Sequence, residues 1–98
     1  MKRDEIIEKL RAHEADLRAQ GVAHAALFGS LARGDDRPDS DIDILVDLDP
    51  AIVVTIFDYA GVKELIADMF DRPVDVVSRE SLKPRVQPTA TADVIYAF

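Results

Sequence analysis

The chain has 98 residues, 48% of them hydrophobic, which predicts one small domain spanning residues 1–98 with a modest core. Its 19 acidic and 12 basic residues give a net charge of −7, which argues against a nucleic-acid-binding module because such modules concentrate positive charge. The absence of cysteine excludes disulfides and thiolate zinc sites. No signal-peptide core and no apolar run near the roughly 20 residues of a membrane span are present, so we expect a cytoplasmic protein.

The first half of the chain predicts a helix followed by a strand. Residues 3–20 repeat apolar side chains at helical spacing and stop before Gly21, which predicts one amphipathic helix. Residues 22–28 form a short apolar run, typical of a buried strand that ends at Gly29. Residues 30–34 are expected to form a short helical turn that opens from this strand.

The second half predicts two more strands and a long helix. After a polar loop, residues 41–48 have the pattern of a second strand. A helical pattern covers about 54–70, residues 74–77 predict a third strand, and residues 89–98 are compatible with a short helix. This order predicts an α/β (or α+β) domain, with a mixed sheet of three to four strands and helices packed on it.

Asp41 and Asp43 open the second predicted strand. Residues two apart on a strand face the same side, about 6.6 Å apart along the chain, and like charges there repel unless a cation lies between them. Mg²⁺ is commonly held by one or two carboxylates together with substrate phosphates. The pair therefore suits a magnesium–nucleotide complex, although two acids on a solvated strand are the commoner explanation of such a pair alone.

Asp75 is the only charged residue of the third predicted strand. If that strand lies beside the second one in register, about 4.8 Å away, Asp75 completes a cluster of three acids with Asp41 and Asp43. Three acids can hold two metal ions about 3.5–4 Å apart, an arrangement used in phosphoryl transfer. An outward-facing residue on an edge strand explains Asp75 equally well when it is taken alone.

Gly29 and Ser30 directly follow the first predicted strand. A glycine here lets the backbone approach a phosphate closely, and the N–H groups of the following turn with the Ser30 hydroxyl would form an anion site. Arg33, one turn further on, could reach the same phosphates. For an isolated Gly-Ser pair, an ordinary turn with a capping serine is the simpler explanation.

The aromatic residues belong to none of these motifs. They are expected in the core or at a partner contact: Phe57, Tyr59, Phe70, Tyr96 and Phe98. His13 and His24 are too far apart and unaccompanied to predict a zinc site. We expect His13 on a solvated helix face and His24 at the margin of a strand.

Together, the segments Gly29–Gly34 (GSLARG) and Ser40–Ile44 (SDIDI) resemble the hallmark motif of the polymerase-β-type nucleotidyltransferase superfamily. Ten residues separate Ser30 from Asp41, a spacing similar to that of the minimal nucleotidyltransferases. These are small prokaryotic proteins often paired with HEPN-domain partners in toxin–antitoxin modules. The resemblance covers nearly the whole chain, including the third strand with its acid.

The resemblance implies a role for each motif residue. Gly29 and Ser30 would bind the phosphates of the nucleotide, with Arg33 as a further contact. Asp75 would act as the general base toward the accepting hydroxyl. The catalytic and metal-binding residues would be three acids: Asp41, Asp43 and Asp75. The reaction would be attack on the α-phosphate of ATP with pyrophosphate leaving, and the protein would contribute positioning and charge neutralisation.

The resemblance also implies a partner. Larger members of the superfamily hold the acceptor with a second domain, so a partner protein is expected to present it here. The expected function is magnesium-dependent transfer of AMP from ATP to a hydroxyl of a HEPN toxin, with this protein as its antitoxin in a homo- or hetero-oligomer. Two alternatives stay open: an antitoxin that neutralises its partner by binding alone, and a nucleotidyltransferase for small molecules of the antibiotic type. Neither nucleic acid nor a membrane is an expected partner.

Overall fold

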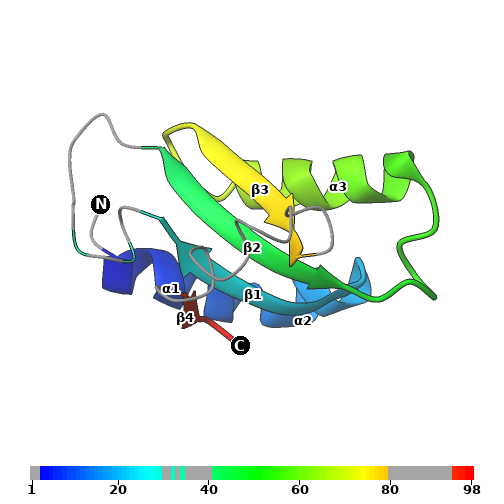
Figure 1. Ribbon diagram of the computed structural model, residues 1–98, viewed down its shortest axis with the longest axis horizontal. Coiled ribbons are helices and arrows are strands. Elements are labelled where there is room, and N and C mark those ends of the chain that lie inside the picture. The colour runs from blue at the N-terminus through cyan, green and yellow to red at the C-terminus, as the bar shows by residue number, and fades with distance from the viewer. Residues whose placement is uncertain (1–2, 30–31, 33, 35–40, 80–93) are drawn as a thin grey trace.

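The computed structural model describes residues 3–29, 32, 34, 41–79 and 94–98 (Figure 1). These residues form, in chain order, α1 (Arg3–Ala12), α2 (Glu14–Ala19), β1 (Val22–Phe28), β2 (Ile42–Leu48), α3 (Ile56–Ala67), β3 (Val74–Ser78) and β4 (Ile95–Tyr96). None of the helices in this described part is long and apolar enough to cross a membrane.

The strands form one mixed sheet in the order β3-β2-β1-β4. β1 runs antiparallel to β2 and β4, whereas β2 and β3 are parallel and are joined through α3. Helices α1 and α2 contact β1, and α3 contacts β3 (Figure 1). The predicted α+β domain with a mixed sheet is therefore confirmed.

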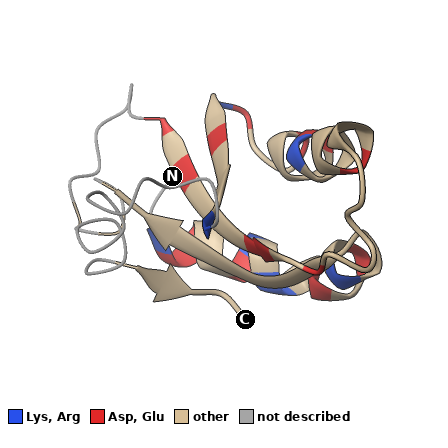
Figure 2. Ribbon diagram, turned by 45° about the vertical axis from the view of Figure 1, so that its right-hand side comes forward, with Lys and Arg blue, Asp and Glu red and all other residues tan. Residues whose placement is uncertain are grey.

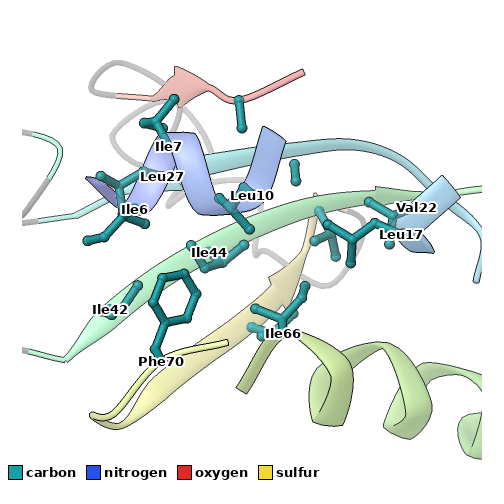
Figure 3. Close-up of a cluster of buried hydrophobic side chains, with 14 of the residues drawn as sticks. Ile6, Ile7, Leu10, Leu17, Val22, Leu27, Ile42, Ile44, Ile66 and Phe70 are labelled. Carbon is teal, nitrogen blue, oxygen red and sulfur yellow. The ribbon is translucent and has the colours of Figure 1, made fainter. Parts of the chain in front are cut away.

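One face of the sheet forms the hydrophobic core (Figure 3). The strands contribute alternate residues to it: Ala25, Leu27, Ile42, Ile44, Val46 and Val76. The helices close it with a second set: Ile6, Leu10, Leu17, Val62 and Ile66. Complete burial of one Leu or Ile side chain contributes about 1.5–3 kcal/mol. Because side chains alternate along a strand, the residues between these core positions lie on the opposite face.

The N-terminal helical segment is broken at His13, so the prediction of one helix over residues 3–20 is wrong. His13 has φ −105° and ψ 15°, and its Nδ1 lies 2.9 Å from the carbonyl oxygen of Lys9. The chain changes direction at this break, and Leu10 of α1 and Leu17 of α2 are both fully buried. Gly21 then ends the segment with φ 101°, as expected for a helix stop.

Three other predictions need correction. Within the predicted helix 89–98, residues 95–96 instead form β4 on β1, because Ile95 and Ala97 face the core while Tyr96 lies on the other side. His24 lies inside β1 rather than at its margin. Helix α3 begins later than predicted because Thr55 caps it. Residues 35–40 and 89–93, and most of the predicted turn 30–34, lie outside the described residues.

Candidate active site

Asp43 of β2 and Asp75 of β3 are direct neighbours. The strands pair in parallel with Asp43 opposite Asp75, and a 3.0 Å hydrogen bond from Ile42 N to the Pro73 carbonyl lies at the start of this pairing. Paired residues share a face of a sheet, so both carboxylates lie on the face opposite the core. Figure 2 shows acidic positions at neighbouring ends of the two strands. The structure thus brings two of the three predicted acids together.

Asp41 lies immediately before β2 and is exposed. Within residues 3–29, 32, 34, 41–79 and 94–98, no three histidine or acidic side chains are grouped closely enough to hold a metal ion. Of the three predicted acids, Asp43 and Asp75 are therefore an adjacent pair, and Asp41 lies two residues before Asp43 in the chain. Asp43 is half-buried, whereas Asp75 is exposed on the edge strand of the sheet.

Gly29 lies against the Asp43 carboxylate. Phe28 pairs with Asp43 across β1 and β2, so the chain leaves β1 beside this acid. Gly29 has φ 77°, in the left-handed region that favours glycine. A Cβ added to Gly29 would lie only 2.4 Å from Asp43 Oδ2. The Asp43 carboxylate therefore occupies the place of a Cβ on residue 29, an approach to the backbone that only glycine permits.

The turn after Gly29 is attached to the core and to α1. Ala32 is 5% exposed and belongs to the core, and its carbonyl accepts a 3.0 Å hydrogen bond from Arg3 Nη1. The sequence offers no signal for Arg3, because its partner is a backbone group 29 residues away. Ser30 and Arg33, the predicted phosphate contacts, lie outside the described residues.

A second polar group lies further along the same face of the sheet. Arg79 Nε donates a 2.7 Å hydrogen bond to Asp47 Oδ1, and this bond raises the pKa of Arg79 above its ordinary value. Arg79 also donates to the Tyr96 hydroxyl, and the Tyr96 ring meets His24 edge to face with centroids 6.3 Å apart. No local pattern in the sequence indicates this group, since its members come from four separate strands or strand ends.

Residues 3–97 match the family model described as the nucleotidyltransferase domain. The chain belongs to the nucleotidyltransferase family. It is 34% identical over 94 residues to the protein adenylyltransferase MntA of Thermococcus cleftensis, covering 95% of this chain and 93% of the relative. It is 35% identical over 94 residues to a Methanocaldococcus jannaschii protein assigned as a protein adenylyltransferase, covering 94% of each.

Solved structures share the fold of this nucleotidyltransferase. One assigned as a minimal nucleotidyltransferase has a TM-score of 0.71 at 31% identity, covering 97% of this chain and 95% of that chain. A toxin–antitoxin crystal structure with AMP-PNP has a TM-score of 0.68 at 22% identity, covering 100% of this chain and 73% of that chain. The predicted nucleotidyltransferase fold and activity are thereby confirmed.

The donor atoms of this nucleotidyltransferase fit a hard cation. Asp43 and Asp75 offer only carboxylate oxygens, which suit Mg²⁺. Two neighbouring carboxylates repel each other, and a divalent cation removes that repulsion. The missing Cβ of Gly29 lets the Asp43 carboxylate lie directly against the backbone at the end of β1. The two carboxylates can therefore hold a divalent cation beside the end of β1.

Proposed function

We propose that this nucleotidyltransferase transfers AMP from ATP to a hydroxyl of a partner protein, uses Mg²⁺, and serves as the antitoxin of a HEPN-domain toxin. The observation that carries the proposal is the Asp43–Asp75 pair with the Gly29 backbone against it. The 34% identity to MntA of Thermococcus cleftensis, a protein adenylyltransferase, supports a protein acceptor. A chain of the same fold occurs in a toxin–antitoxin structure with AMP-PNP, which is in keeping with an adenine nucleotide as donor.

The candidate residues divide this reaction into metal binding, proton transfer and phosphate binding. Asp43 and Asp75 would hold Mg²⁺, with Asp41 as a nearby third ligand, and the bound ion would neutralise charge on the phosphates. Asp75, the more exposed of the pair, takes the proton from the acceptor hydroxyl. The close backbone at Gly29 admits the phosphates, and Ser30 and Arg33 are proposed as further phosphate contacts.

The acceptor hydroxyl has to approach from the open side of this pair. Among the described strands β3 is the outermost, so no described strand lies beyond Asp75 on that side. The hydroxyl oxygen attacks the α-phosphorus of ATP, the bond to the β-phosphate oxygen breaks, and pyrophosphate leaves with the bonding electrons. The residues contribute by aligning the two reactants and by stabilising charge, because phosphoryl transfer gains most from positioning and electrostatics.

The decisive experiment supplies the protein with ATP labelled at the α-phosphate, Mg²⁺ and the product of the adjacent reading frame. We expect label on the partner, with the mass of one or more AMP groups, and none with Asp43→Asn. Asp71→Asn is the matched control because it removes an exposed acid in the turn before β3, outside the acid pair. No labelling by the wild type, or full labelling by Asp43→Asn, would contradict the proposal.

The same variant separates catalysis from neutralisation by contact. If transfer silences the toxin, cells that express the toxin with Asp43→Asn should not grow, although the two proteins still form a complex. Growth equal to that with the wild type would instead support neutralisation by binding alone.

A further inference from the structure

Four large apolar side chains are exposed between β2 and the first turn of α3. We call these four side chains the apolar patch. Their exposed fractions are 45% for Ile52, 72% for Val54, 79% for Ile56 and 81% for Phe57. Side chains of this kind are usually buried, and several of them exposed on one segment are typical of an interaction surface. Phe57 was expected in the core or at a partner contact, and its exposure excludes the core.

Hydrogen bonds hold the backbone of the apolar patch in one conformation. Asp49 accepts three of them, 2.9–3.0 Å long, from the N–H groups of Ala51, Ile52 and Val53. Asp58 Oδ2 accepts two more, each 3.0 Å long, from Val54 and Thr55, and forms the capping box of α3. A surface that is ordered before binding loses less conformational entropy in a complex. The segment that carries the apolar patch is therefore ordered while its side chains are exposed.

The underside of this segment is packed. Val53 points toward Gly21 at the end of α2, where an added Cβ would lie only 2.5 Å from Val53 Cγ2. The carbonyl of Gly21 also accepts a 2.7 Å hydrogen bond from Asp49 N. The same added Cβ would lie 3.0 Å from Ile52 Cγ2, so Ile52 is partly packed here as well. These contacts fix one side of the segment to the domain, whereas Val54, Ile56 and Phe57 face outward.

The charge of this segment indicates which partner would fit. Residues 49–62 contain two acids, Asp49 and Asp58, and no Lys or Arg. Hydrogen bonds from the backbone of Thr55 and Val54 lower the pKa of Asp58, so it is charged at neutral pH. A second copy of this chain, with its own net charge of −7, would be repelled. A protein that presents apolar side chains surrounded by Lys and Arg is complementary.

We propose that the apolar patch is the docking surface for such a basic partner protein. This inference rests on the proposed function, because we identify the basic partner with the protein that accepts AMP. Stable interfaces bury about 800 Å² per protein, and a few central residues provide most of the affinity. Ile56 and Phe57, the two most exposed members, would provide that centre.

Docking at the apolar patch would be separate from the chemistry. Asp43 is the second of the 7 residues of β2 and the patch lies beyond the strand's end, so about 17 Å of strand lies between them. In Figure 1 the segment between β2 and α3 is at the right, and the start of β2 is at the left. The patch should therefore control affinity for the partner, while the acid pair controls the rate of transfer.

The test measures binding and labelling of the product of the adjacent reading frame. We expect the double variant Ile56→Ser/Phe57→Ser to raise Kd at least about tenfold, a loss of about 1.4 kcal/mol of binding free energy, because it removes both central contacts. KM for the partner should rise while kcat at saturating partner stays the same. Phe57→Leu, which keeps an apolar side chain, is the matched control and should bind within about twofold of the wild type.

The outcomes distinguish this inference from the proposed function. Asp43→Asn should bind the partner with unchanged Kd and transfer nothing. If the double variant binds as tightly as the wild type, or if the wild type does not bind, the docking surface is wrong whatever the labelling shows. Dimerisation of the free chain that the double variant abolishes, measured by sedimentation, would assign the patch to a second copy and overturn the proposal. Patch-dependent binding without labelling would uphold the docking surface and contradict the proposed function.

Discussion

The backbone of Gly29 touches the carboxylate of Asp43 so closely that a Cβ on residue 29 would come within 2.4 Å of Asp43 Oδ2. In Gly29→Ala the new methyl group must displace this carboxylate, so we expect labelling of the partner to fall at least about a hundredfold. The left-handed φ of 77° adds about 1–2 kcal/mol of backbone strain.

Gly34→Ala is the matched control for that prediction. Gly34 has a similar φ of 87°, but no atom of the described residues lies within 4 Å of its added Cβ. Chemical denaturation should show a similar loss of stability in both variants, while Gly29→Ala loses far more activity. Equal activity in the two variants would show that the contact with Asp43 is unimportant.

Asp43 and Asp75 bring two negative charges into register on neighbouring strands. Without metal, Asp75→Asn should raise the free energy of unfolding by about 0.2–1 kcal/mol, because it removes a like-charge pair. It should also abolish transfer. Mg²⁺ should raise the Tm of the wild type more than that of the variant, since only the wild type has both carboxylates. An equal effect of Mg²⁺ on both proteins would argue against a metal at this pair.

Arg3 and Arg11 of α1 each donate a side-chain hydrogen bond to a backbone carbonyl far away in the sequence. Arg3 Nη1 donates to Ala32 O at 3.0 Å, and Arg11 Nε donates to Ala97 O at 2.8 Å. Replacement of either by Met should cost about 1 kcal/mol of stability. Only Arg3→Met should lower kcat, by about ten- to a hundredfold, since Ala32 belongs to the turn after Gly29. Similar kcat values for the two variants would remove Arg3 from the positioning of that turn.

The hydroxyl of Tyr59 closes part of the outer edge of β3. It donates to Val76 O at 3.2 Å and accepts from Ser78 N at 3.1 Å. We expect Tyr59→Phe to lower the free energy of unfolding by about 1–3 kcal/mol and to promote association through the edge strand. Lys63→Met is the control, because it removes the ammonium 4.6 Å from the centre of the same ring but keeps the hydroxyl. Urea unfolding and sedimentation would show whether the hydroxyl is the important group.

The capping box of α3 should make stability depend on pH. Hydrogen bonds from Thr55 and Val54 lower the pKa of Asp58 below its ordinary value of 3.8. Its stabilising effect is therefore complete above pH 3.8 and is lost as the pH falls through the lowered pKa. Urea unfolding should find Asp58→Asn less stable than the wild type at pH 7, with the difference shrinking below pH 3.8. A constant difference would exclude this ionisation as its cause.

Local pattern was sufficient for the strands that carry the site. β1 has the predicted bounds, and β3 is one residue longer than predicted. β1 and β2 bury residues on both faces, Ala26 and Leu45 on the face opposite the core, and a continuous apolar run is typical of such strands. The break at His13 left no comparable trace, because the apolar spacing of one long helix and of two short ones is similar. The two residues of β4 are too few to show a period.

The sequence predicted the acids of the candidate site, but their closeness depended on how the strands pair. The pairing of Asp43 with Asp75 required a parallel register that no local pattern contains, and the structure supplies it. The closeness of Gly29 to Asp43 follows from the pairing of Phe28 with Asp43, which is also a long-range relationship. The bond from Arg3 to Ala32 involves a backbone carbonyl, and every residue has one, so the sequence could not single it out.

Because β2 and β3 are parallel, the chain has to pass through α3 before Asp75 can lie beside Asp43. During synthesis, Asp43 and its neighbour Gly29 leave the ribosome well before β3 does. The emerging chain can therefore pair β1 with β2 and still lack half of its acid pair. A translation product that stops within α3 never acquires it, so the two acids come together only in a chain that has been made through β3.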